Sequence, residues 1–229
     1  MPSLVLKKRA PNLRERMDDP ACSLDRLHAT YRQFGPVNQL FAAWHAVYAH
    51  YLRPQLAGSP ATLLDIGCGG GDLARRLAAW GKRDGLELHI TAADPDARAF
   101  EYARSRPAPP NVTFCRALSS DLVAAGRRFD VVVSNHLLHH LTDQELTGLC
   151  RDSECLATKL VLHNDIRRSA LAYLGFNATR LFFRNSFIVA DGLTSIRRSF
   201  SPAELETLAP PGWTVEAVFP YRNLLVYRS

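Results

Sequence analysis

Four histidines stand where an imidazole could take part in proton transfer. His136, His139 and His140 follow one apolar run, and His163 ends another. An imidazole gains and loses its proton near neutral pH, so His139, His140 and His163 are candidate general bases. His136 and His140 are also four residues apart and could share one face of a helix. However, the sequence has no His-Glu-x-x-His motif and no third ligand at an obvious spacing, so we expect no metal site.

A glycine-rich turn joins an apolar run to an amphipathic one. Residues 63–73 read LLDIGCGGGDL, and Asp94 follows the next apolar run along the chain. Glycines allow the backbone to approach a ligand closely, and a carboxylate at the end of the second strand can accept hydrogen bonds from both ribose hydroxyls. The pattern therefore predicts a nucleoside-containing ligand.

The acidic residues around this turn restrict the ligand further. Asp65 lies two positions before the first glycine and would repel a pyrophosphate. Asp72 stands where the dinucleotide motif G-x-G-x-x-G has Gly or Ala. Both observations disfavour a dinucleotide dehydrogenase and favour a cationic ligand such as S-adenosylmethionine, which carries a sulfonium and an ammonium group.

Three sequence blocks together carry a family resemblance. They are LDIGCGGG at 64–71, AADP at 92–95 and FDVVVSNHLLHHL at 129–141. Residues from about 60 to 165 resemble a class I S-adenosylmethionine-dependent methyltransferase, in particular the small-molecule methylases of ubiquinone and menaquinone biosynthesis. The resemblance extends more faintly to methylases of aromatic polyketides and phenolic lipids.

The resemblance implies a set of cofactor-binding residues. By this resemblance, the loop glycines line the methionine part of S-adenosylmethionine and Asp65 supports its amino group. Asp94 holds the ribose, and the residues after the fourth strand close over the cofactor. Many relatives have an Asp near the adenine after the third strand, whereas this chain reads CRALSSD at 115–121, where Leu118 would supply only a backbone amide. The full set is Asp65, Gly67, Cys68, Gly69, Gly71, Asp94, Pro95, Leu118, Asn135 and His136.

Apolar runs and helical patterns alternate from Thr62 onward, which predicts an α/β fold with a Rossmann-like, mostly parallel sheet. The predicted strands lie at 63–66, 87–93, 112–114, 129–134, 160–163, 213–219 and 222–227. Only two residues separate the last two strands, too few for a parallel crossover, so we expect a seven-stranded sheet with an antiparallel last strand. Capping boxes predict helix starts at Thr142 and at Ser201.

Two segments lie outside this alternation. Residues 1–58 predict two amphipathic helices separated at Gly35 and Pro36, either packed into the core or forming an N-terminal helical lid. Residues 59–229 are the expected methyltransferase core, and 166–198 an insertion rich in arginine and aromatic residues that caps the substrate. The arginines of the insertion either pair with an anionic group or solvate a face.

Composition excludes several classes of protein. The 229 residues are 47% hydrophobic, carry a formal charge of +6 and include five cysteines without a Cys-x-x-Cys pair. No run approaches the roughly 18 to 20 apolar residues of a membrane span, and the N-terminus lacks a secretory leader pattern. We expect a cytoplasmic protein without disulfides, and the sequence leaves its oligomeric state open.

These features predict a methyltransferase that acts on a small apolar or aromatic acceptor. We expect O-methylation of a phenol, quinol or polyketide hydroxyl, with C-methylation as the lesser alternative. Nucleic acid is disfavoured, because the fourth strand is followed by Ser134–Leu137 and not by the Pro-Pro-aromatic motif of base N-methylases. An RNA or protein methyltransferase and a non-catalytic cofactor-binding protein remain alternatives.

Overall fold

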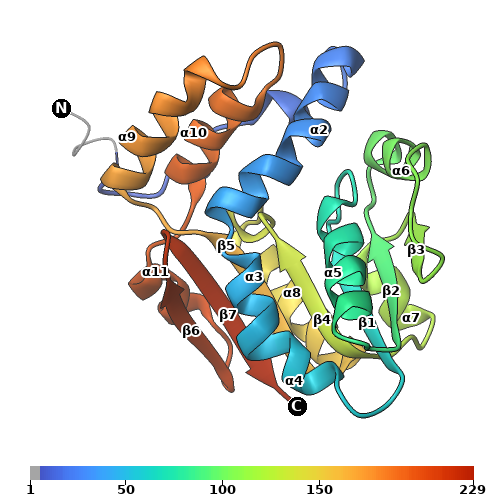
Figure 1. Ribbon diagram of the computed structural model, residues 1–229. Helices are drawn as coiled ribbons and strands as arrows, with labels where there is room; N and C mark the ends of the chain where they lie inside the picture. Colours follow the sequence, from blue (N-terminus) through green and yellow to red (C-terminus); the bar gives the residue numbers. More distant parts are fainter. Residues whose placement is uncertain (1–5) are drawn as a thin grey trace.

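A seven-stranded sheet forms the centre of the computed structural model, which describes residues 6–229 (Figure 1). The strand order is β3-β2-β1-β4-β5-β7-β6, with β1 to β5 parallel and β7 antiparallel to both of its neighbours. The predicted architecture is thus confirmed. The strands are β1 Ala61–Ile66, β2 Leu88–Ala93, β3 Val112–Cys115, β4 Phe129–Asn135, β5 Ala157–Ile166, β6 Trp213–Val218 and β7 Arg222–Arg228. The prediction that the N-terminus carries no secretory leader involves Met1–Val5. These residues lie outside the described part of the chain, so that expectation stays a prediction.

Helices cover both faces of the sheet. Their bounds are α2 Leu24–Phe41, α3 Trp44–Val47, α4 Arg53–Leu56, α5 Asp72–Arg83, α6 Ala97–Arg104, α7 Ser119–Ala124, α8 Asp143–Leu156, α9 Ala170–Ala178, α10 Ile188–Arg198 and α11 Pro202–Leu208. Short helical turns are η1 Arg16–Asp18, η2 Tyr48–Leu52, η3 Leu138–His140 and η4 Thr179–Leu181. Both predicted capping boxes are present, at the starts of α8 and α11.

Alternate side chains of each central strand enter opposite cores, as the period of a strand requires. On one face, Leu63 and Val131 pack with residues of α3, α4 and α5. On the other face, Leu64 and Val132 pack with residues of α7, α8 and α11. Both faces are covered, which explains why the strands are continuous apolar runs.

The N-terminal segment differs from the sequence expectation. Helix α2 continues through Gly35 and Pro36 and ends only at Phe41, before Ala43 adopts a left-handed conformation with φ of 55°. A proline inside a helix removes one hydrogen bond, crowds the carbonyl group four residues before it, and restricts the residue that precedes it. The last of these effects is reduced here, because Gly35 has no Cβ. The segment after the true break is buried in the first core, where Trp44 and Leu52 pack against the sheet.

Helices α2, α9 and α10 stand together at one end of the molecule, at the top in Figure 1. This end lies beyond the carboxyl ends of the parallel strands, where ligands of open α/β sheets bind. Within residues 6–229, no helix combines the length and apolar character that crossing a membrane requires.

Candidate active site

A cavity of about 420 Å³ opens between the sheet and the three helices at its carboxyl end. Residues that follow β1, β2 and β4 form its floor, among them Gly67, Asp94 and Asn135. Side chains of α2, α9 and α10 form its roof, and Glu15 reaches it from the segment before α2. Most of the predicted cofactor residues are thereby brought to one place.

The glycine turn is held by the end of the second strand. The backbone N–H groups of Gly67 and Cys68 donate to the carbonyl oxygen of Ala93, at 2.8 and 3.1 Å. Asp94 accepts the N–H of Gly69 on Oδ2 at 2.8 Å and that of Asp96 on Oδ1 at 2.9 Å. Cys68 and Pro95 also line the cavity. The Asp94 carboxylate thus fixes the loop and at the same time borders the space beside it.

Three carboxylates concentrate negative charge at the loop end of the cavity, those of Asp65, Asp72 and Asp94. Asp65 is buried, and its Oδ2 atom has no hydrogen-bond partner among the described residues. Burial, together with Asp72 and Asp94, raises the pKa of Asp65 well above its usual value. An unpartnered buried acid among like charges fits a ligand that brings a cation, such as the ammonium group of S-adenosylmethionine, and would repel a pyrophosphate.

Asn38 of α2 connects this acidic end to the residues after β4. Its amide donates to Asp72 Oδ2 at 2.9 Å, and its Oδ1 lies 2.9 Å from His136 Nε2 and 3.2 Å from Asn135 Nδ2. The buried guanidinium of Arg222 in turn donates to Asn135 Oδ1 at 3.1 Å. Burial lowers the pKa of His136 well below its usual value, so its ring is neutral. The cavity wall is therefore a polar network between α2 and the sheet.

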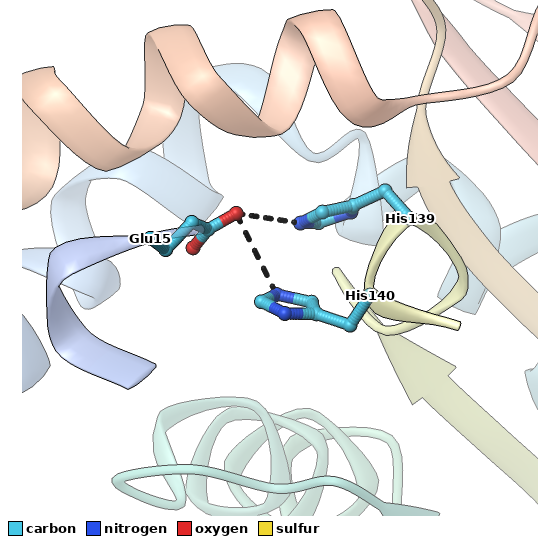
Figure 2. A group of neighbouring side chains, drawn as sticks. All are labelled: Glu15, His139 and His140. Atoms are coloured by element: carbon cyan, nitrogen blue, oxygen red, sulfur yellow. Dashed lines mark ion pairs between the residues drawn. The ribbon is translucent and has the colours of Figure 1, made fainter. Parts of the chain in front are cut away.

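Beyond His136 along the cavity wall, His139 and His140 meet Glu15 (Figure 2). Turn η3 follows β4 directly and directs both rings toward the N-terminal segment. Glu15 Oε1 lies 3.2 Å from His139 Nε2 and 3.7 Å from His140 Nε2. Burial alone would lower the pKa of His139, but Asp165 and Glu15 raise it to about 9. Burial alone would raise the pKa of Glu15, which the two imidazoles hold below its usual value.

The segment that carries Glu15 is tied to α10. Asp191 accepts the backbone N–H groups of Arg16 and Met17, at 2.8 and 3.0 Å. Ser195 donates its hydroxyl to Glu15 Oε1 at 2.7 Å. Residues far apart in the sequence thus build one wall of the cavity.

Three of the predicted site residues do not line the cavity within the described part of the chain: Gly71, Leu118 and His163. Gly71 instead begins α5. Leu118 is 53% exposed and its N–H donates to Asp121 Oδ2, which corrects the expectation that its amide meets the adenine.

The expectation that His163 is a base at the site is also corrected. Strand β5 extends to Ile166, so His163 lies inside the strand and its ring enters the second core. The ring contacts Ser134 Oγ at 2.8 Å and Ser153 Oγ at 3.2 Å and stacks on Trp213. Burial lowers the pKa of His163 to about 3, so the ring is neutral and inaccessible to an acceptor.

Sequence reasoning missed four residues of the site: Glu15, Asn38, Asp165 and Arg222. Arg222 and Asp165 lie near the same end of the neighbouring antiparallel strands β7 and β5. The pairing register of these two strands could have been used to predict that both residues lie at the same edge of the sheet. The acid-rich run at residues 15–19 was a signal for Glu15. Its partners, however, depend on the packing of the N-terminal segment, which no local pattern specifies.

Comparison with known proteins finds similarity to methyltransferases in the middle of the chain. Residues 63–157 match a family model described as a methyltransferase domain. The chain is 34% identical over 116 residues to the ubiquinone biosynthesis O-methyltransferase of Methylobacterium sp. (strain 4-46), covering 48% of this chain and 44% of that protein. It is 28% identical over 129 residues to a 2-phytyl-1,4-naphtoquinone methyltransferase of a Nostoc species, covering 52% and 55%. The matched region thus spans about half the length of these relatives.

Solved structures of other proteins share the fold. The plantazolicin methyltransferase BpumL, solved in complex with SAH, superposes with a TM-score of 0.56 at 12% sequence identity, covering 90% of this chain and 87% of that one. This likeness concerns the fold alone, whereas the family model matches the sequence from β1 to the start of β5. Residues 63–157 thus match a methyltransferase domain, and the fold of the chain is that of a methyltransferase solved with SAH.

Proposed function

We propose that this protein methylates the hydroxyl group of a small apolar or aromatic acceptor, a phenol or quinol, with S-adenosylmethionine as the methyl donor. The observation that carries the proposal is the single cavity that joins the acidic glycine loop to the Glu15–His139–His140 group. One end suits a cationic cofactor, and the other can act on a hydroxyl proton.

The cofactor end is built to hold a cation beside a ribose. When bound, S-adenosylmethionine supplies an electrophilic methyl group, which the acceptor oxygen attacks in line, so that the carbon–sulfur bond breaks as the oxygen–carbon bond forms. Asp65 supplies the unpartnered carboxylate for the ammonium group. Asp94 lies beside the loop at the end of β2, the place from which a carboxylate reaches ribose hydroxyls. The remaining residues exclude water and orient the two reactants.

The acceptor end is apolar and aromatic. Its wall comes from α2, α9 and the start of α10, with Phe34, Val37, Phe41, Leu171, Phe176 and Ile188. Phe41 and Phe176 meet edge to face, with ring centroids 5.9 Å apart. Such a wall favours a flat, apolar molecule with few polar groups. The names of the two curated relatives, both concerned with quinones, support the same class of acceptor.

The acceptor proton leaves at the Glu15–His139–His140 group. A phenol with a pKa of about 10 reacts faster as its phenolate, and removal of the proton is worth roughly 100-fold to 10,000-fold. His140 is the more exposed of the two imidazoles, while His139 and Glu15 are almost fully buried. His140 is therefore the proposed proton acceptor, and His163 takes no part. His139, whose pKa of about 9 keeps it protonated near neutral pH, is proposed to hold Glu15 in place.

The test uses S-adenosylmethionine with a labelled methyl group and two pools of acceptors. One pool holds phenols, quinols and aromatic polyketides, and the other holds tRNA and peptides. We expect label in the first pool only. Label in RNA or peptide alone would exclude a small-molecule acceptor. Binding of S-adenosylhomocysteine by calorimetry without label in either pool would instead favour a non-catalytic cofactor-binding protein.

A further inference from the structure

Three side chains of metal-ligating type converge on one wall of the cavity (Figure 2). Glu15, His139 and His140 each offer one ligand atom, and these atoms all lie within 4.8 Å of one another. Glu15 Oε1 is 3.2 Å from His139 Nε2 and 3.7 Å from His140 Nε2. Ligand atoms that surround a first-row cation tetrahedrally at 2.0–2.1 Å are about 3.3 Å apart. The spacing therefore fits a cation between them.

A second observation is the unpartnered nitrogen of His139. Nε2 accepts and donates no hydrogen bond among the described residues, although His139 is only 1% exposed and the nitrogen faces Glu15. The other ring nitrogen, Nδ1, lies 2.7 Å from Asp165 Oδ1. A carboxylate behind one imidazole nitrogen is the arrangement found behind metal-bound histidines, and a bound cation would replace the proton that Nε2 carries beside Glu15.

The other two side chains have supporting partners as well. Ser195 Oγ donates to Glu15 Oε1 at 2.7 Å. Asp18 Oδ2 lies 3.4 Å from His140 Nδ1, on the ring edge away from Glu15. Each candidate ligand is thus oriented by a residue outside the group, as the ligands of metal sites usually are.

Charge at this wall also favours a cation. The carboxylates of Glu15, Asp18 and Asp165 surround the two rings. The guanidinium of Arg198 lies 3.6 Å from Asp18, and it donates to the carbonyl oxygens of His139 and His140. Arg9 pairs with Asp143. Neither Arg9 nor Arg198 forms an ion pair with Glu15 within residues 6–229.

We propose that Glu15, His139 and His140 bind one divalent first-row cation, of the class of zinc or manganese. Two imidazoles and one carboxylate suit such ions better than magnesium or calcium, which prefer oxygen ligands. Three protein ligands leave at least one position open, and all three side chains line the cavity. The sequence suggested no metal because the third ligand comes from the N-terminal segment.

The role of the ion rests on the proposed function. An acceptor hydroxyl that occupies the open position coordinates the cation through its oxygen, which lowers the pKa of the hydroxyl. With the cation bound, the three side chains act as ligands in place of proton acceptors, so the proton of the hydroxyl passes to water, and the oxygen then attacks the methyl carbon. The proposed metal site thereby narrows the class of acceptor to molecules whose reactive oxygen can bind a metal ion.

The test measures metal binding directly. Tag-free protein is treated with a chelator, dialysed, and titrated with Zn²⁺, Mn²⁺ and Co²⁺ by calorimetry, with the bound metal counted by mass spectrometry. We expect one equivalent of Zn²⁺ or Co²⁺ per chain and a change in the visible spectrum of Co²⁺ on binding. Glu15→Gln and His140→Ala should each weaken binding at least tenfold. His89→Ala, which removes an exposed histidine, should leave it unchanged.

Two results would overturn the site: no stoichiometric binding of any of the three ions, or binding that Glu15→Gln and His140→Ala leave intact. Retained affinity for S-adenosylhomocysteine shows that each variant is folded. The proposed function is judged separately, because full phenol methylation by metal-free protein would overturn the catalytic role of the ion and keep the function. Stoichiometric metal binding without methylation of any phenol or quinol would overturn the proposed function and keep the metal site.

Discussion

Asp165 holds His139 through both of its carboxylate oxygens. Oδ2 accepts the backbone N–H of His139 and Oδ1 lies against Nδ1, both at 2.7 Å. Strands β4 and β5 are parallel neighbours, and β5 continues past the end of β4, so Asp165 reaches the turn η3. This contact fixes the orientation of the ring, and it directs Nε2 to Glu15.

Replacing Asp165 with Asn should therefore destabilise the protein. The variant removes one of the two carboxylates that pair with the buried His139, and loss of one member of a buried pair lowers stability by about 3 to 5 kcal/mol. We expect a loss of about 3 kcal/mol in the free energy of unfolding, measured with urea at pH 7. The matched control is Asp143→Asn, whose carboxylate pairs with Arg9 and is 65% exposed; it should change stability by less than about 1 kcal/mol. Equal losses in the two variants would contradict the buried role of Asp165.

Asp65→Asn should have opposite effects on the free protein and on its complex. The pKa of Asp65 is raised by burial and by Asp72 and Asp94, so its ionised form is unfavourable in the folded protein at neutral pH. Removing that charge should raise the free energy of unfolding of the ligand-free protein by about 1 to 2 kcal/mol. Affinity for S-adenosylmethionine should fall by roughly tenfold to a hundredfold.

Urea unfolding without ligand and calorimetric titration measure the two effects of Asp65→Asn. Unchanged affinity in the variant would mean that Asp65 does not face the ammonium group. A loss of stability without ligand would mean that the side chain makes a favourable contact in the free protein.

Much of the fold follows from local chemistry. Continuous apolar runs such as Leu63–Ile66 predict strands buried on both faces, because parallel sheets are covered on both sides. The capping box at Thr142 fixes the start of α8 through its own side chains. The glycine loop could also be predicted, since its geometry depends on neighbouring residues and on the strand beside it.

The rest depends on contacts that no local pattern contains. Glu15 reaches His139 because α10 binds the N-terminal segment through Asp191. Helix α2 continues past Pro36 because the preceding residue is glycine and Tyr31 and Val37 are buried on either side of this point. His163 was misplaced because an error of three residues at the end of β5 changes a position at the sheet edge into one inside the core. Tertiary packing decides each case.

Gly71→Ala should reveal a steric requirement of the glycine loop. Gly71 has a φ of 74°, and an added Cβ would contact the ring of Phe114 and lie 2.7 Å from Arg75 Nη1. Gly85 has nearly the same φ, 72°, with nothing within 4 Å of the added atom. We expect Gly85→Ala to lower the free energy of unfolding by about 1 kcal/mol, and Gly71→Ala by about 1 to 3 kcal/mol more. Similar losses in urea unfolding would show that Phe114 moves aside without cost.

His163 should make the protein sensitive to acid. Burial lowers its pKa from 6.5 to about 3 in the folded protein. Between these values the unfolded chain binds a proton at His163 and the folded protein does not, so acid favours unfolding. The contribution of this residue is fully present above pH 6.5 and is lost as the pH falls toward 3. The slope approaches about 1.4 kcal/mol per pH unit.

The measurement compares urea unfolding of the wild type and His163→Gln from pH 8 to pH 4. Glutamine stays neutral and can bond to Ser134 and Ser153, whose hydroxyls contact the His163 ring. The variant should be less stable at pH 8, and its deficit should shrink steadily below pH 6.5, because only the wild type must keep a buried imidazole neutral. His89→Gln, at an exposed position, should differ from the wild type by a constant amount over the same range. A constant deficit in His163→Gln as well would mean that the ring is protonated in the folded protein, in conflict with its place between two serine hydroxyls and Trp213.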